Sequence, residues 1–139
     1  MITVGRLEYA SLPELGFFDI DAKIDTGADS CSIHCSSIRI DEKNQTVHFK
    51  LLDELHPDYT LHDIAMPISK MKRVKSSNGK VEERVFIQTP VSLGGQTYLA
   101  QVSLSDRKEM KYPMLIGRKF LAKRYLVDVS VKYQFPKKV

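Results

Sequence analysis

Residues 18–30 read FDIDAKIDTGADS, and the fold class can be predicted outward from this segment. Up to Ile24, apolar side chains alternate with charged ones, the period of two that is typical of a half-buried β-strand. Turn-forming residues beginning with Thr26-Gly27 then break the alternation. The pattern therefore predicts a strand that delivers Asp25 directly into a tight turn.

Short strands and tight turns are also expected in the rest of the chain. One hairpin turns at Asn78-Gly79, a pair that accepts the positive φ angles of a tight turn, and its charged flanks indicate a protruding arm. A second hairpin turns at Gly94-Gly95, and its alternating apolar residues place it in the core. The chain is therefore predicted to be all-β. We expect strands at residues 31–33, 47–52, 71–75, 81–87, 91–93, 97–104, 113–117 and 125–131, a surface loop at 53–63 and one helix of about two turns at 118–124.

The length and composition fit one soluble globular domain over residues 1–139. Of the 139 residues, 42% are hydrophobic and 9% aromatic, which is enough to form a core at this size. No apolar run approaches the ~18 residues of a membrane span, and the N-terminus lacks the layout of a signal peptide. Cys31 and Cys35 are too few for a disulfide scaffold. Cytoplasmic and periplasmic locations both stay open, because a removed signal peptide leaves no trace.

The turn at Asp25 suits acid–base chemistry. Two carboxylates that share one proton can drive the attack of water on an amide, one as base and the other as acid, because close like charges cannot both ionise. Gly27 lets the backbone approach the carboxylate, and Thr26 offers a hydroxyl that can lock the loop. An ordinary Asp-Thr-Gly turn is the alternative, since this tripeptide also occurs by chance.

A second motif, far along the chain, favours the acid–base interpretation of the Asp25 turn over an ordinary turn. Met114-Leu115-Ile116-Gly117-Arg118 resembles the signature near the C-terminus of retropepsins, in which an Asp-Thr-Gly-Ala-Asp turn, a flap hairpin and an apolar-Gly-Arg strand follow in this order. The chain is more similar still to a bacterial family of retropepsin-like proteins historically described as ATP-dependent zinc proteases and linked with ATP-grasp glutamate ligases. Besides the Asp25 loop, the segments that carry this resemblance are residues 5–6, 11–13, 76–79, 104–107 and 115–129.

The resemblance implies a closed retropepsin-like barrel with a flap hairpin, and it implies roles for five residues. Asp25 becomes the catalytic carboxylate, Thr26 the residue that braces the two catalytic loops, and Gly27 the floor of the site. Asp29 and Arg118 become partners in a buried ion pair that ties the catalytic loop to the closing strand, since a guanidinium can grip a carboxylate through two bonds. A plain turn residue and a surface charge are the alternatives for these two.

The implied activity is that of an aspartic endopeptidase. The chain contains one Asp-Thr-Gly loop and the mechanism needs two carboxylates, so we expect a homodimer in which Asp25 faces its copy. The alternatives are a peptide-binding module that keeps the fold without turnover and, more remotely, a zinc-dependent protease. No cofactor is expected, and the sequence has no Gly-Lys-Ser/Thr loop for a nucleotide.

The cysteines and histidines give no clear zinc motif. If residues 31–35 form a strand, Cys31 and Cys35 lie about 13 Å apart with His34 pointing the other way, so they can neither share an ion nor form a disulfide. On a helix the two thiols would face together and could bind zinc. We expect the strand and no metal site. The other histidines, which lack a tight ligand spacing, are His48, His56 and His62.

Charge is unevenly distributed along the chain, whose net charge is +4. Residues 1–66 hold 5 Lys/Arg against 12 Asp/Glu, whereas residues 67–105 hold 6 against 2 and residues 106–139 hold 10 against 3. The basic arm and the implied link with glutamate ligases predict an acidic, Glu-rich peptide substrate. A solvated surface is the alternative, and nucleic acid is not expected because neither stacking aromatics nor a groove-entering helix is visible. The residues expected to meet the substrate are Lys72, Arg73, Lys75, Asn78 and Gly79.

Overall fold

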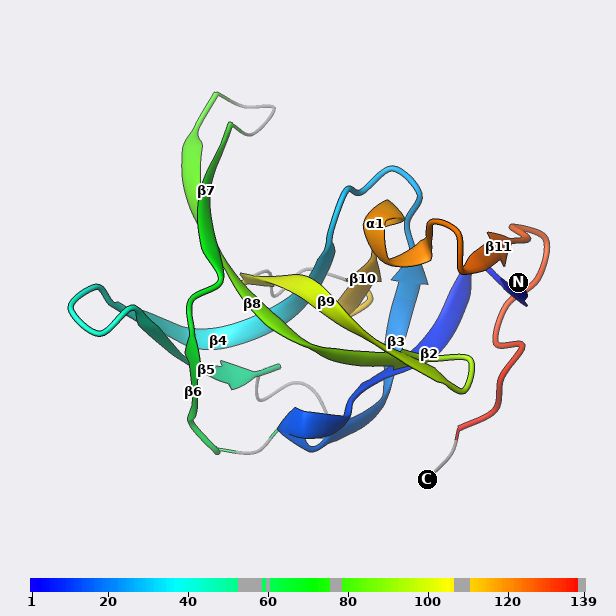
Figure 1. The fold of residues 1–139 in the computed structure, drawn as a ribbon, viewed down its shortest axis with the longest axis horizontal. Helices are drawn as coiled ribbons and strands as arrows, with labels where there is room; N and C mark the ends of the chain where they lie inside the picture. Colours follow the sequence, from blue (N-terminus) through cyan, green and yellow to red (C-terminus); the bar gives the residue numbers. More distant parts are fainter. Residues whose placement is uncertain (53–58, 60, 76–78, 107–110, 138–139) are drawn as a thin grey trace.

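The computed structural model describes residues 1–52, 59, 61–75, 79–106 and 111–137, and β-strands dominate it (Figure 1). Six of the strands are β2 (Leu7–Leu12), β3 (Phe17–Ile24), β4 (Cys31–Asp41), β8 (Val81–Leu93), β9 (Gln96–Ser105) and β10 (Met114–Ile116). They pair in the order β10-β3-β2-β8-β9-β4, and β4 pairs again with β10, so the sheet closes on itself. The predicted all-β closed barrel is confirmed.

The period-two pattern explains how the barrel obtains its core. In β3, Ile20, Ala22 and Ile24 are buried, whereas Lys23 between them is exposed. The opposite strands contribute further apolar side chains to the same cluster, and burial of this apolar surface is the main force that stabilises the fold. The largest of the fully buried apolar side chains include Leu12, Ile33, Phe49, Leu51, Ile87, Leu93, Met114 and Ile116.

Four further features surround the barrel. β5 (Thr46–Leu51) and β6 (Ile64–Pro67) extend the sheet from the far half of β4. β7 (Lys70–Lys75) pairs antiparallel with the first part of β8, and this hairpin, here called the flap, projects on the same side as the loop after β3 (Figure 1). β1 (Ile2–Val4) and β11 (Tyr125–Val127) form a separate parallel pair. The helical turns are η1 (Pro13–Leu15) and α1 (Arg118–Leu121), and the described residues contain no helix long and apolar enough to cross a membrane.

Two strands are longer than the sequence predicts. β4 runs for 11 residues instead of ending at Ile33, and its alternation was hidden because the register with β5 shifts between Ser36 and Arg39. β8 is one strand of 13 residues that continues through Pro90. Pro90 lies opposite Leu99 of β9, between the segments of β8 that pair with β7 and with β2, where a missing backbone N–H is tolerated.

Two elements near the C-terminus are shorter than predicted. α1 has four residues, not the seven of 118–124, because Ala122 turns to an extended conformation and Lys123 has a φ of +66°. β11 has three residues, not the seven of 125–131, because the Asp128 carboxylate accepts a hydrogen bond from the Ser130 backbone and starts a turn. Most of the predicted loop at 53–63 lies outside the described residues.

Candidate active site

The loop that carries Asp25 is fixed between two barrel strands. β3 and β10 run parallel, and the Asp25 backbone N–H donates to the Ile116 carbonyl at 2.9 Å. Within the loop, the Gly27 N–H donates to Asp25 Oδ1 at 3.0 Å. A Cβ on Gly27 would lie 3.2 Å from that same oxygen, so glycine permits the close approach. The loop therefore orients the Asp25 carboxylate through its own backbone.

The apolar-Gly-Arg motif closes against the other side of this loop. Gly117 has no room for a side chain, since a Cβ there would lie 2.4 Å from the Ser30 carbonyl oxygen. The next two backbone N–H groups, from Arg118 and Lys119, donate to the carbonyls of Ala28 and Asp29 at 2.8 and 3.1 Å. The two motifs that are distant in sequence therefore form one backbone-bonded unit.

Asp29 lies between two cations at the edge of this unit. Its Oδ1 is 3.6 Å from Arg118 Nη2 and its Oδ2 is 3.1 Å from Lys119 Nζ, and Arg118 Nη1 also donates to the Thr26 carbonyl at 3.0 Å. The hydrogen bond from Lys119 is the main cause that lowers the pKa of Asp29 below its ordinary value of 3.8.

The ion pair of Asp29 and Arg118 is therefore present, but it is not buried as predicted. The two side chains are 48% and 54% exposed. The reason is that α1 turns its last two residues into the core and its first two toward solvent. Lys119 was missed by the sequence analysis, although its place directly after Arg118 would have suggested it.

The exposed side of the loop is available for contact with another chain. Thr26 and Gly27 are exposed and Asp25 is half-buried. Thr26 itself is contacted through its carbonyl, which accepts the hydrogen bond from Arg118. A role for the Thr26 hydroxyl in bracing a second loop therefore stays a prediction, because it requires the partner.

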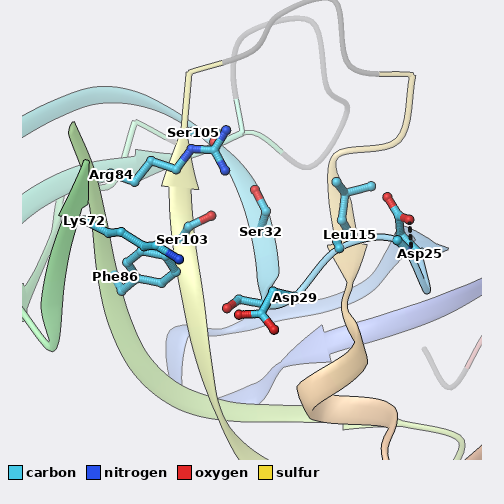
Figure 2. Close-up of a pocket in the computed structure, with 12 residues that line it drawn as sticks. Asp25, Asp29, Ser32, Lys72, Arg84, Phe86, Ser103, Ser105 and Leu115 are labelled. Carbon is cyan, nitrogen blue, oxygen red and sulfur yellow. Dashed lines mark hydrogen bonds between the residues drawn. The ribbon is translucent and has the colours of Figure 1, made fainter. Parts of the chain in front are cut away.

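A cavity of about 470 Å³ opens beside Asp25 (Figure 2). One register row that crosses four strands lies along it: Phe86 of β8 pairs with Ser103, Ser103 pairs with Ser32, and Ser32 pairs with Leu115 of β10. Asp25 lies at one end of this row and the flap residues Lys72, Arg84 and Phe86 lie at the other (Figure 2). The row therefore presents hydroxyl groups between the carboxylate and the flap.

The flap residues predicted to meet a substrate lie in different places. Lys72 lines the cavity, whereas Arg73 pairs with Glu83 at 3.8 Å and is 79% exposed. Lys75 pairs through its backbone with Val81, and Gly79 has a φ of +84° as the tight turn requires. Asn78 lies outside the described residues.

Sequence reasoning missed Arg84, Phe86 and the serines of the cavity. Arg84 lies directly opposite Lys72 in the flap. The predicted position of the hairpin turn fixes this register, so the pair could have been inferred from the sequence. The serines gave no such signal, because a row across four strands depends on how the barrel closes.

The residues considered for zinc are not gathered in one place. Cys31 and Cys35 are buried on β4, so the strand alternative holds, and burial raises the pKa of Cys31 to about 11. His34 is buried on the same strand, whereas His48 lies on β5, and His56 lies outside the described residues. Within the described ranges, no group of three or more His, Cys, Asp or Glu side chains could hold a metal ion.

The chain is similar to proteins of one family over almost its whole length. The family model described as "Retropepsin-like aspartic endopeptidase RimB" matches residues 3–138. Proteins named probable alpha-L-glutamate ligase match as well: the one from Shewanella halifaxensis is 32% identical over 134 residues and the one from Desulfotalea psychrophila is 31% identical over 135. These matches cover 94% and 93% of this chain but only 29% and 28% of the relatives.

A solved structure supports the same fold. The crystal structure of a protein of unknown function from Legionella pneumophila aligns with a TM-score of 0.72 and 25% sequence identity. The alignment covers 96% of this chain and 97% of that one.

Proposed function

This chain belongs to the RimB-like family of retropepsin-like aspartic endopeptidases, and on that premise we propose that it hydrolyses peptide bonds with two Asp25 carboxylates, one from each copy in a homodimer. The observation that carries the proposal is the Asp25 loop, which holds an oriented carboxylate at the end of a cavity of about 470 Å³. The cavity is open to an extended chain, and its row of hydroxyls and its flap offer polar partners for a peptide backbone.

The homodimer is needed because the described site contains one catalytic loop. A two-fold axis brings the same residue of each copy together, so it would set Asp25 against the partner's Asp25. Thr26 and Gly27, which are exposed in the single chain, support such a contact. Two carboxylates this close share one proton, which supplies an acid and a base at the same site.

The reaction follows from this shared proton. The ionised carboxylate removes a proton from water, the water oxygen attacks the amide carbon, and the protonated carboxyl gives its proton to the carbonyl oxygen. The tetrahedral intermediate then breaks its C–N bond, and the proton held by the first carboxylate passes to the leaving amine. The second carboxylate takes back the proton that it gave to the carbonyl oxygen. One carboxyl group is then ionised and the other protonated, as the next cycle requires.

We propose that the peptide substrate is acidic. Lys72 and Arg84 place two positive charges at the end of the cavity remote from Asp25. The relatives named glutamate ligase suggest a glutamate-rich substrate, although this chain spans less than a third of their length. Attraction between exposed charges is screened over ~8 Å at physiological ionic strength. Added salt should therefore raise KM for acidic peptides and should have less effect on kcat.

The Asp25→Asn variant tests hydrolysis directly. We expect cleavage of a glutamate-rich peptide to be abolished while binding of the same peptide persists, because Asn keeps the shape of the side chain and cannot act as the base. Asp41→Asn is the control, since Asp41 lies in β4 beyond the barrel and contacts Asn44. Cleavage that survives Asp25→Asn would contradict the proposal, and a wild-type protein that binds without cleaving would favour the binding-module alternative.

A further inference from the structure

The two faces of the flap differ in how their charges are balanced. Arg73 and Glu83 lie directly opposite each other in register, and their side chains form an ion pair on the outer face. The inner face carries Lys72 and Arg84, which also lie directly opposite each other and both line the cavity. Like charges in this position repel each other. The carboxylates near them are Asp29, which lines the same cavity, and Glu82, which lies two residues before Arg84 on the same face of β8.

The two inner cations differ from one another as well. The charge of Lys72 contributes to the lowered pKa of Asp29, so it already acts on a carboxylate of the protein. Among the described residues, Arg84 has neither an ion pair nor a side-chain hydrogen bond. Its side chain is half-buried beside Ser105 at the cavity (Figure 2).

Arg84 also lies where two cavities meet. Together with Ser105 it lines the cavity beside Asp25 and a second cavity of about 310 Å³. The second cavity has apolar walls that include Ile38 and Leu104, and it carries carboxylates, among them Asp106. Arg84 therefore lies between the carboxylates of the second cavity and those of Asp25 and Asp29 in the first, and it is a cation that a substrate carboxylate can reach from the first cavity.

From this geometry we propose that Arg84 determines specificity by binding a side-chain carboxylate of the peptide substrate. The inference rests on the proposed function and deepens it, because it names the residue that reads the acidic group. A guanidinium can bind a carboxylate through two parallel hydrogen bonds, which an ammonium cannot do. Arg84 lies on the flap, remote from the Asp25 end of the row, so it affects substrate binding and not the chemical step (Figure 2).

The test measures binding in the Asp25→Asn background, where turnover cannot interfere. The probe is a fluorescein-labelled peptide of alternating glutamate and alanine, with the corresponding glutamine peptide as its neutral control. Arg84→Gln should raise Kd for the glutamate peptide about tenfold, as the loss of a charge-assisted hydrogen-bond pair predicts. Binding of the glutamine peptide should stay within about twofold.

Two further variants separate the proposed contact from charge alone. Arg84→Lys keeps the charge and loses the planar fork, so its Kd should lie between wild type and Arg84→Gln. Arg73→Gln removes an equal charge from the outer face and should leave Kd within about twofold of wild type. Circular dichroism and the melting temperature establish that each variant is folded.

Three outcomes would overturn the inference: equal effects of Arg84→Gln and Arg73→Gln, equal effects of Arg84→Gln on both peptides, or a wild-type site that does not prefer glutamate over glutamine. Its failure differs from failure of the proposed function. If binding depends on Arg84 but the protein with the wild-type Asp25 cleaves no peptide, the inference is supported and hydrolysis is contradicted. If acidic peptides are cleaved and Arg84→Gln leaves KM unchanged, hydrolysis is supported and the inference about Arg84 is contradicted.

Discussion

Among single residues, two glycines show how the Asp25 loop is built. A Cβ on Gly117 would meet the Ser30 carbonyl at 2.4 Å, whereas a Cβ on Gly27 would meet Asp25 Oδ1 at 3.2 Å. The first contact is with backbone, which cannot yield cheaply, because the two preceding carbonyls of Ala28 and Asp29 are held by hydrogen bonds to Arg118 and Lys119. The second is with a side chain that can move aside, but the side chain that moves is the Asp25 carboxylate, to which we assign the proposed chemistry. We therefore expect a side chain at position 117 to lower the stability of the fold, and a side chain at position 27 to lower activity.

Alanine substitutions should separate these two effects. Gly117→Ala should lower the free energy of unfolding by about 1–3 kcal/mol, the usual cost of overpacking a tight site. Gly27→Ala should cost less stability and yet reduce kcat more. Urea denaturation and a peptide-cleavage assay on both variants measure this, and similar stability losses in the two would contradict the account of the loop.

The pairs of Asp29 predict a dependence of stability on pH. The pKa of this carboxyl is lowered below 3.8, chiefly by Lys119, so the pairs stabilise the fold above pH 3.8 and this contribution is lost as the pH falls through the lower folded-state value. We expect Lys119→Gln to lower the melting temperature slightly at neutral pH, because the pair is exposed, and to match wild type at low pH. A difference that persists unchanged in acid would be inconsistent with this role.

Arg118→Leu should behave differently, and it is the companion variant. It removes one of the two cations on Asp29 and also the hydrogen bond to the Thr26 carbonyl. Its melting temperature should drop by a few degrees, and the deficit should narrow in acid without vanishing, because the bond to a carbonyl does not depend on the charge of Asp29.

Among the elements, the two ends of the chain are joined by a buried carboxylate on β2. Glu8 is fully buried, and it accepts backbone hydrogen bonds from Gly5 at 2.8 Å, Gln134 at 3.0 Å and Phe135 at 3.3 Å. The segment after β11 is thereby attached to β2, with a further backbone bond from Tyr133 to the Leu7 carbonyl at 2.8 Å.

Removing this carboxylate should weaken the whole fold. Glu8→Ala leaves three backbone N–H groups without their acceptor, one of them buried, so we expect the free energy of unfolding to fall by about 3 kcal/mol. Glu8→Gln keeps one acceptor oxygen and should cost less. Urea denaturation of both variants provides the measurement, and an Ala variant as stable as the Gln variant would show that these bonds contribute little.

How far the sequence predicts an element depends on how local its cause is. The strand before Asp25 and the positive φ angles of Gly79, Gly94 and Gly95 follow from alternation and backbone preference, and the structure confirms them. The length of β4 could not be predicted, because a shift in register masks its period. The early end of α1 could not be predicted either, because the extended Ala122 and the positive φ of Lys123 are not residue preferences that the sequence shows.

The candidate site divides in the same way. Asp25, Thr26 and Gly27 are contiguous, so their turn could be predicted from sequence, and Arg118 followed from the resemblance. Two features could not be predicted: the row of residues along the cavity, and the fact that Lys72 lines the cavity whereas Arg73 does not. Both depend on which face of a hairpin turns inward when the barrel closes.

For the whole molecule, the central claim is that the active unit contains two chains. The described chain supplies one oriented carboxylate and an exposed loop around it, whereas hydrolysis by shared-proton chemistry needs two carboxylates. Stability and catalysis should therefore depend differently on concentration: dilution should remove activity while the barrel, closed within one chain, stays folded.

Mixing wild-type and Asp25→Asn subunits shows whether activity needs two intact chains. After equilibration, an equal mixture should retain about one quarter of the activity of the same total amount of wild-type protein, because only dimers of two wild-type chains keep both carboxylates. The activity should follow the square of the wild-type fraction across a series of mixtures. A linear dependence, with about one half of the activity in the equal mixture, would mean that each chain acts alone, and it would contradict the account.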